Sequence, residues 1–343
     1  MKKVFLLLGL LLVSVAASAK TKELNVYNWS NYMPKDVIVQ FEKETGIHVN
    51  YSTYDGNDTL YAKLKADPHA GYDIIVPTSY FVDRMRNEHM LLPLDKSKLS
   101  NFKNLDKALL NKSFDPGNQY SIPYFWGSTG IVVNKNYFDP NTITSWNDLW
   151  NPRFKDQLLI LDDPHDVFSM ALMALGYSAN DADPDHLHQA YLKLKALLPN
   201  VKLFNSDAAK VNYIDEDATI GMGYSGDTYQ AMSENSNLVY VYPKEGFVVW
   251  VDCMAIPKYA PHADSAYKFM NFLMRPDIAA KLSEELDYAS PNAAAKALLP
   301  KAMRENPAIY PDDKILARAQ FEVDPGNLDM LYEKYMEELK VSA

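Results

Sequence analysis

A tryptophan and an aspartate share one face of an apolar segment in the last third of the chain. In residues 247–256, Trp250 and Asp252 lie two positions apart in a run typical of a strand, so their side chains point the same way. A carboxylate beside a tryptophan is costly to bury without a partner. We therefore expect Asp252 to bind a cation. The alternative is a surface strand with one wetted face.

A second acidic group, Asp162, Asp163 and Asp166, falls within five residues where a helix is expected to begin. Acids at a helix start often cap free backbone amides, which would account for one or two of them. Taken alone, the group favours this capping interpretation. A binding role for Asp163 and Asp166 needs support from the rest of the chain.

Aromatic residues in expected loops and strands supply that support. They are Trp29, Tyr32, Tyr80, Tyr224, Trp250 and Tyr288. The face of an aromatic ring attracts an ammonium group by about 0.5–2 kcal/mol, and a charge-assisted hydrogen bond adds about 1.5–3 kcal/mol. Rings and carboxylates together suit a ligand in which ammonium groups alternate with methylene chains.

Motifs for catalysis or cofactor binding are absent from the sequence. There is no GxGxxG, P-loop, HExxH or GxSxG motif, and the seven histidines are scattered. Cys253 is the only cysteine, so no intrachain disulfide can form and a core position is expected for it. We expect no cofactor, no metal and no catalytic residue.

The segments that must position the candidate residues alternate between strand and helix, which predicts a doubly wound α/β sheet. Strands are expected at 23–28, 47–54, 72–76, 158–161, 218–224, 238–242 and 247–256. Helices are expected at 36–45, 59–65, from 79 or 80, and at 167–175, 186–198, 265–274, 278–285, 292–298 and 328–339.

Loops that follow these strands carry the candidate residues. Residues 28–32 and 77–80 follow strands of the first half, and residues 162–166 follow a strand of the second half. Parallel α/β sheets bind ligands beyond the carboxyl ends of their strands. Two such edges facing each other would form a cleft rich in aromatic rings and carboxylates.

The N-terminus and the net charge indicate an exported protein. Lys2 and Lys3 precede an apolar run at 4–13, and Ala17-Ser18-Ala19 then matches a signal-peptidase site, so cleavage is expected near Ala19. The run is shorter than the roughly 20 residues of a membrane span. A net charge of −10 argues against nucleic acid and anionic membrane as partners. The chain is long enough for two domains.

Seven segments carry a family resemblance. They are Tyr27–Tyr32, Phe41–Gly46, Tyr72–Pro77, Tyr120–Gly127, Asn205–Asp207, Trp250–Asp252 and Tyr288–Asn292. In these segments, and over essentially its whole mature length, the chain resembles the spermidine/putrescine-binding periplasmic proteins of polyamine ABC importers. The resemblance implies a polyamine ligand, an inner-membrane ABC permease as partner, and a protein that is not embedded in the membrane.

The resemblance also implies a two-lobe periplasmic binding protein fold, similar to type II, with the ligand in the inter-lobe cleft and two crossing strands as the hinge. After a signal peptide at 1–19, the first lobe would comprise 20–127 plus 250–296. The second would comprise 128–249 plus 297–343. The chain is expected to cross between the lobes near 124–133 and 248–255.

The resemblance assigns fourteen ligand-binding positions: Trp29, Ser30, Asn31, Tyr32, Thr78, Tyr80, Asp163, Asp166, Ser206, Tyr224, Trp250, Asp252, Tyr288 and Glu322. Three of them depart from the relatives. Asn31 replaces a common acid, Tyr224 replaces the tryptophan of spermidine-binding relatives, and Glu322 replaces a common amide. The preferred polyamine is therefore left open.

We expect a periplasmic polyamine-binding protein without enzymatic activity. Two alternatives stay open: a binding protein for another organic cation or ferric iron on the same scaffold, or a secreted enzyme that uses Asp163 and Asp166. The sequence does not distinguish transport from sensing, and it determines neither the affinity nor the oligomeric state.

Overall fold

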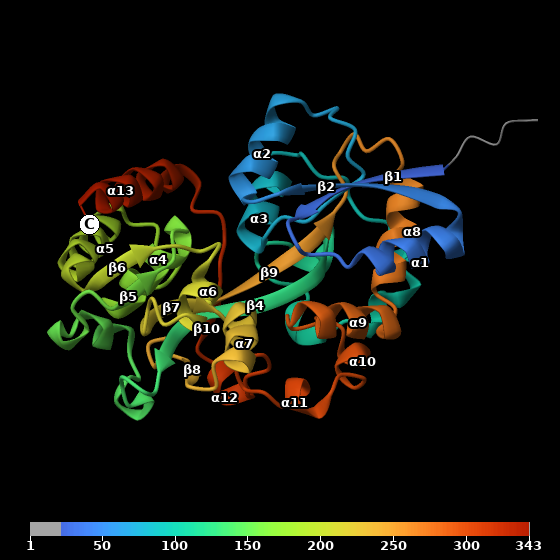
Figure 1. The fold of residues 1–343 in the computed structure, drawn as a ribbon. Coiled ribbons are helices and arrows are strands. Elements are labelled where there is room, and N and C mark those ends of the chain that lie inside the picture. The colour runs from blue at the N-terminus through green and yellow to red at the C-terminus, as the bar shows by residue number, and fades with distance from the viewer. Residues whose placement is uncertain (1–21, 343) are drawn as a thin grey trace, which may run out of the picture.

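Two long antiparallel strands, β4 (Ser121–Asn134) and β9 (Phe247–Ala255), run side by side through the middle of the molecule and join its two halves (Figure 1). They belong to a mixed sheet with the strand order β2-β1-β3-β9-β4-β7-β5-β6. This computed structural model describes residues 22–342, so the expected signal peptide at 1–19 lies outside the described residues.

The first half is built around β1 (Lys22–Trp29), which pairs in parallel with β2 (Ile47–Tyr54) and β3 (Ile74–Ile75). Helices α1 (Lys35–Thr45) and α2 (Asn57–Ala66) lie between these strands in the sequence, and α3 (Ser79–Asn87) follows β3. Helix α1 ends as predicted, because Gly46 adopts the left-handed conformation with φ 67° and donates its N–H to Glu42.

The second half repeats the alternation. In it, β5 (Leu158–Ile160) pairs in parallel with β6 (Val201–Phe204) and β7 (Ile220–Tyr224). β8 (Leu238–Val241) and β7 both pair with β4 in antiparallel fashion. The helices of this half are α4 (Pro164–Ala174), α5 (Pro184–Leu197), α6 (Ala209–Ile214) and α7 (Ser225–Glu234).

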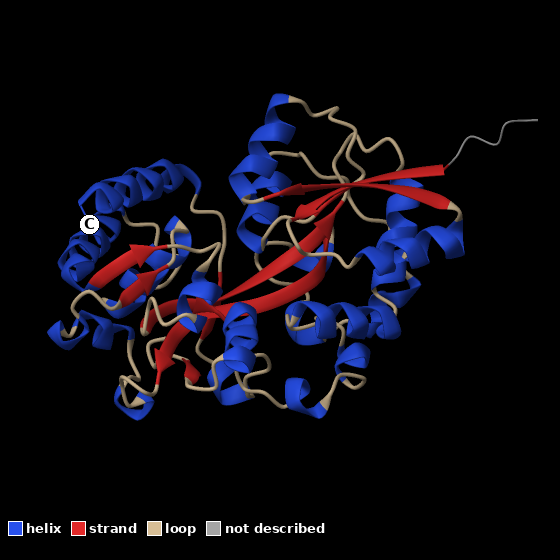
Figure 2. Cartoon of the chain, in the orientation of Figure 1, coloured by secondary structure: helices blue, strands red, loops and turns tan. Residues whose placement is uncertain are grey.

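The last quarter of the chain is mostly helical, and its helices lie over both halves (Figure 2). Its elements are α8 (Ala263–Leu273), α9 (Pro276–Leu286), α10 (Ala293–Lys296), α11 (Lys301–Arg304), α12 (Asp313–Leu316), β10 (Ala319–Phe321) and α13 (Asp329–Ser342). Between Lys22 and Ser342, no helix is long and apolar enough to cross a membrane.

Several sequence predictions need correction. The strand expected at 72–76 has only two residues, and β6, β10, α6 and α7 were not predicted. The expected α/β sheet is mixed, because β4 and β9 run antiparallel to each other, β9 runs antiparallel to β3, and β4 runs antiparallel to β7. Helix α7 was missed because its first two residues, Ser225 and Gly226, are typical of a turn.

Strand β9 shows the two-faced pattern predicted for it. Val249, Val251 and Cys253 are fully buried in one hydrophobic cluster, together with residues of α3. Trp250 belongs instead to the cluster of the second half, which includes α4, α5 and part of α13. Because the strand is covered on both sides, the position of each of its side chains is determined by packing as well as by hydrogen bonding.

Phe41 tests the core of the first half. Its ring is fully buried against Phe269, with the ring centroids 4.8 Å apart, and it also packs on Phe272. We expect Phe41→Ala to lower the free energy of unfolding by about 3–5 kcal/mol in urea denaturation, because a large cavity is left. Val39→Ala on the same helix, where Val39 is 60% exposed, should change it by less than about 0.5 kcal/mol. Equal effects would contradict this packing.

Candidate functional site

A cavity of about 880 Å³ lies where the carboxyl ends of strands from the two halves face each other. All fourteen residues assigned from the sequence line it. Thirteen further lining residues were not predicted: Tyr54, Asp55, Gly56, Asn57, Asp58, Asp162, Pro164, Asp207, Asp227, Glu333, Met336, Glu337 and Lys340. The loops after β1 and β5 therefore meet as expected, and β2, α7 and α13 also contribute.

The charge of the cavity wall is strongly one-sided. Its acids are Asp55, Asp58, Asp162, Asp163, Asp166, Asp207, Asp227, Asp252, Glu322, Glu333 and Glu337. Lys340 is the one basic residue among those that line the cavity, and its Nζ lies 3.8 Å from Oδ2 of Asp162. A concave surface with eleven acids and one lysine attracts cations and repels anions.

Asp252 projects from the middle of β9 and is held by two hydroxyl groups. The Tyr32 hydroxyl donates to its Oδ2 at 2.7 Å, and the Thr78 hydroxyl donates to its Oδ1 at 2.8 Å. Burial raises the pKa of Asp252 to about 6, although these two hydrogen bonds lower it. Among residues 22–342, no lysine, arginine or histidine forms an ion pair with it, so a ligand cation would be its natural partner.

Trp250 lies next to Asp252 and forms part of an aromatic wall. Its ring meets Tyr224 and Tyr288 edge to face, at centroid distances of 5.9 Å and 5.8 Å. The ring fits because residue 127 of β4 is glycine, where an added Cβ would lie 2.3 Å from Cζ2 of Trp250. The Trp250 Nε1 atom is buried without a hydrogen-bond partner in the part of the chain that the structure describes.

The end of β1 and the loop after it form another part of the cavity wall. Trp29 donates its Nε1–H to the Val76 carbonyl at 2.8 Å, which fixes the indole across the end of the sheet. Ser30 donates to Oδ1 of Asp55 at 2.7 Å. Asn31 is exposed and has a φ of 54°, a conformation that asparagine tolerates better than most residues.

The acids at the start of α4 have different roles. Asp163 caps the helix: its Oδ1 accepts the backbone N–H of His165 at 2.9 Å and that of Asp166 at 3.1 Å. The capping interpretation therefore holds for Asp163. Asp166 is buried and instead accepts the Thr129 hydroxyl at 2.5 Å. Burial, and to a smaller extent the charge of Asp163, raises the pKa of Asp166 to about 7.

Asp227 joins the site through a tyrosine from the other half. The hydroxyl of Tyr288 donates to Oδ1 of Asp227 at 2.6 Å, and burial raises the pKa of that carboxyl. The Tyr288 ring also packs on the start of α7, where a Cβ at Gly226 would lie 2.5 Å from Cδ1 of the ring. Sequence reasoning missed Asp227 because it missed α7.

Ion pairs close one edge of the cavity. Arg84 of α3 donates to Oδ1 of Asp324 at 2.8 Å and 3.0 Å, and to Oδ2 of Asp329 at 2.9 Å. The other oxygen of Asp329 lies 3.1 Å from Nε2 of His165. Burial alone would raise the pKa of Asp329, but His165 and Arg84 lower it to about 2. These contacts tie α3 to α4 and α13.

Aromatic stacking reinforces the same edge. The His165 ring lies between Tyr80, at a centroid distance of 4.4 Å, and Tyr332, at 5.2 Å. Tyr80 also lines the cavity, and His165 is flanked in sequence by Asp163 and Asp166. Contacts between the two halves therefore involve residues that line the cavity or lie next to them in the sequence.

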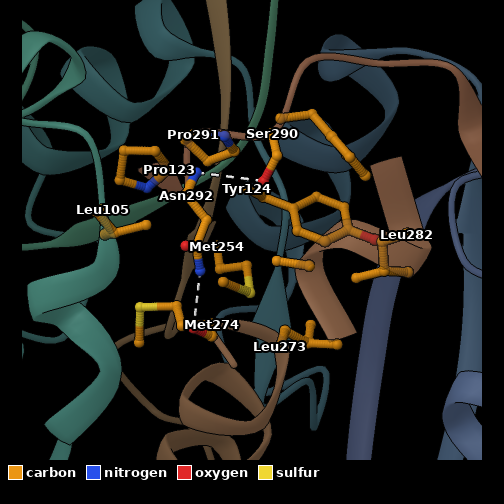
Figure 3. A pocket seen from close by; sticks show the side chains of 12 residues that line it. Leu105, Pro123, Tyr124, Met254, Leu273, Met274, Leu282, Ser290, Pro291 and Asn292 are labelled. Atoms are coloured by element: carbon orange, nitrogen blue, oxygen red, sulfur yellow. Dashed lines mark hydrogen bonds between the residues drawn. The ribbon is translucent and has the colours of Figure 1, made fainter. Parts of the chain in front are cut away.

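A second, smaller cavity lies in the first half beside β4 and β9 (Figure 3). Its wall is largely apolar, and Asn292 donates its Nδ2–H to the Met274 carbonyl at 2.8 Å across one side. Its volume of about 10 Å³ is close to the minimum for one water molecule. This cavity is too small for a ligand and belongs to the packing of the core.

The substitution Arg84→Met removes the ion pairs of the arginine but keeps an unbranched side chain that can pack where the arginine stem packs. We expect the free energy of unfolding to fall by about 2–3 kcal/mol in urea denaturation. This is less than the roughly 3–5 kcal/mol for breaking a fully buried pair, because the Asp329 side chain is 26% exposed. Lys65→Met, which removes an exposed ion pair with Glu88, should have little effect. Similar losses for both variants would contradict the role given to Arg84.

Comparisons with known proteins identify the family to which the chain is similar. Residues 36–311 match the family model of bacterial extracellular solute-binding proteins. The spermidine/putrescine-binding periplasmic protein of Escherichia coli strain K12 is 45% identical, covering 96% of this chain and 94% of that protein. The putrescine-binding periplasmic protein PotF of the same strain is 36% identical, with coverages of 90% and 89%.

A solved structure of a similar protein has the same fold. The spermidine/putrescine ABC transporter substrate-binding protein PotD from Streptococcus pneumoniae matches with a TM-score of 0.83 and 38% identity, covering 94% of this chain and 99% of that chain. The similarities in sequence and structure confirm the resemblance and the fold class predicted from the sequence.

Proposed function

Since this chain belongs to the family of bacterial extracellular solute-binding proteins, we propose that it captures a polyamine, spermidine or putrescine, in the periplasm. It then delivers the polyamine to the permease of an ABC transporter. The observation that carries this proposal is the cavity wall, where eleven acids and one lysine surround tryptophan and tyrosine rings. Relatives named as spermidine/putrescine-binding or putrescine-binding proteins support it.

Capture needs no covalent chemistry. Asp252, held by Tyr32 and Thr78, pairs with one ammonium group of the ligand. The faces of Trp250 and the surrounding tyrosines contact the methylene groups and attract the charges between them. A carboxylate that meets an ammonium group gains a cation that it lacks in the protein alone, so binding relieves repulsion within the wall.

Closure of two lobes completes the mechanism. We assign residues 20–127 plus 250–296 to the first lobe and 128–249 plus 297–343 to the second, with β4 and β9 as the hinge between them. The contacts of Arg84 and His165 hold the two lobes together at the cavity edge in the closed form. Residues 1–19 act as the signal peptide, and cleavage near Ala19 releases the mature protein.

Titration calorimetry with spermidine, putrescine and cadaverine tests the proposal. We expect binding of at least one of the three, and we expect Asp252→Asn to weaken it about tenfold or more, the scale of one charge-assisted hydrogen bond. Asp264→Asn, on the exposed surface, removes the same charge and should leave the affinity unchanged. The absence of binding for all three amines would reject the function, and unchanged affinity in the Asp252 variant would reject the role of that residue.

The raised pKa values predict a pH dependence of binding. Because the pKa values of Asp252 and Asp166 are about 6 and about 7, these groups take up protons as the pH falls from 8 to 5. We expect the affinity for a polyammonium ligand to fall over this range, since a protonated carboxyl no longer pairs with a cation. Calorimetry at pH 8, 7, 6 and 5 measures this affinity. A constant affinity would be inconsistent with these carboxyls as ligand partners.

The stability of the protein without ligand should change in the opposite direction. A carboxyl with a raised folded-state pKa binds a proton more tightly in the folded than in the unfolded state. Its destabilising contribution therefore grows as the pH rises above the unfolded-state pKa of about 4, and it is complete above the folded-state pKa. We therefore expect the melting temperature without ligand to rise as the pH falls from 8 to 5. The increase in melting temperature caused by the ligand should shrink over the same range.

A further inference from the structure

Asn57 and Thr78 stand at the starts of two helices of the first half, and in the described part of the chain neither side chain caps its own helix. Asn57 is the first residue of α2. Thr78 directly precedes α3, at a position where threonine normally accepts a backbone N–H of the helix. Both side chains are buried beside the cavity, so their hydrogen-bonding groups are used elsewhere.

The side-chain amide of Asn57 has one orientation that satisfies its neighbours. Its Oδ1 accepts the backbone N–H of Thr78 at 3.1 Å, and a backbone N–H can only donate. Its Nδ2 therefore faces the Thr78 hydroxyl at 3.1 Å, and it lies 3.4 Å from the hydroxyl of Tyr80. The second contact is long for a hydrogen bond, so Thr78 is the main partner of this amide.

This orientation determines the direction of the Thr78 hydroxyl proton. An amide nitrogen carries only donors, so Oγ1 of Thr78 accepts from Asn57, and its single proton is left for Oδ1 of Asp252 at 2.8 Å. The backbone holds the pair in place as well. Thr78 and Asp252 form an antiparallel β-bridge, and Cys253 donates its N–H to the Pro77 carbonyl at 2.9 Å.

We propose that Asn57 is a positioning residue for ligand binding, which directs the Thr78 hydroxyl proton onto Asp252 and so orients the carboxylate that pairs with an ammonium group. This inference rests on the proposed function. Asn57 acts through Thr78 and needs no contact with the ligand. Without the amide, the Thr78 hydroxyl is free to turn away, and Asp252 loses one of the two donors that hold it.

The other hydroxyl groups around Asp252 do not replace this donor. Four tyrosines face the carboxylate from the surrounding elements, and burial raises the pKa of each: Tyr32, Tyr54, Tyr124 and Tyr288. Tyr32 already donates to the other oxygen of Asp252. The remaining three donate to the Val76 carbonyl, the Tyr32 carbonyl and Asp227. Loss of the Thr78 donor therefore raises the pKa of Asp252, because a hydrogen bond to the ionised form is lost.

Asn57→Leu tests this role, because leucine has a similar shape and no hydrogen-bonding group. In the protein without ligand, we expect Asp252 of the variant to take up its proton at a higher pH. Carbon-13 NMR titration of the aspartate carboxyls measures this shift, and the Asp252 signal is the one that Asp252→Asn removes. Calorimetry with spermidine and putrescine should show an affinity about fivefold or more weaker at pH 6. The loss should be smaller at pH 8, where Asp252 is ionised in both proteins.

A double-mutant cycle with Thr78→Val shows whether Asn57 acts through Thr78. In the Thr78→Val background, Asn57→Leu should cause no further loss of affinity. Asn57→Asp is a second variant, which keeps the acceptor for the Thr78 backbone N–H and removes only the donor. It should weaken binding when Thr78 is present and should not weaken it in the Thr78→Val background.

Asn200→Leu is the matched control for damage to the fold. Asn200 is also buried, in the second half, and its Nδ2 donates to the Leu149 and Asn151 carbonyls at 2.8 Å and 3.0 Å. We expect this control to lower the melting temperature and to leave the affinity for both amines unchanged.

The outcomes separate the two proposals. If the unsubstituted protein binds an amine and Asn57→Leu changes neither the affinity nor the titration of Asp252, the positioning role is rejected and the proposed function stands. The role is also rejected if the loss is equal at pH 6 and pH 8, or if it persists in the Thr78→Val background, since Asn57 would then act through the packing of α2. If the unsubstituted protein binds neither amine, the proposed function itself fails.

Discussion

Uncompensated negative charge inside a walled cavity is the constraint on which the rest of this structure depends. Eleven acids and one lysine line the cavity, and several of the acids are buried. Such an arrangement is unfavourable in the protein alone, as the raised pKa values of Asp166 and Asp252 show. The folded chain tolerates this cost through its large hydrophobic clusters, and a polycation is the kind of ligand that removes it.

Strands β4 and β9 hold this charge in place. β9 carries Trp250 and Asp252 on one face and packs Val249 and Val251 on the other. β4 supplies Gly127, which leaves room for the Trp250 ring, and Thr129, which orients Asp166. The same two strands connect the halves of the molecule, so they form both this connection and part of the cavity wall.

Contacts across the cavity edge use a different kind of interaction. Arg84 reaches Asp324 and Asp329, and the His165 ring lies between two tyrosines. These contacts pair every charge that they bury, whereas Asp166 and Asp252 of the cavity wall form no ion pair with a lysine, arginine or histidine among residues 22–342. Paired charges hold the halves together, and unpaired charges provide the affinity for a cation.

The local sequence pattern was sufficient to predict much of the secondary structure of this protein. The strand at 47–54, the cap at Gly46 and the alternation in β9 follow from residue periodicity and local backbone preference, and each agrees with the structure. The short strand β10 and helix α7 were missed, because three residues, or a helix that opens with Ser-Gly, carry too little periodic signal.

Tertiary structure alone decided which acids meet. Spacing along the chain placed Asp163 and Asp166 at a helix start, and left open whether they cap the helix or bind a ligand. The fold assigns capping to Asp163, buries Asp166, and brings Glu322 to the same wall from about 160 residues away. The sequence determined which chemical groups are present. Burial and distance between remote segments, which no local pattern encodes, determined which carboxylates lack a counterion.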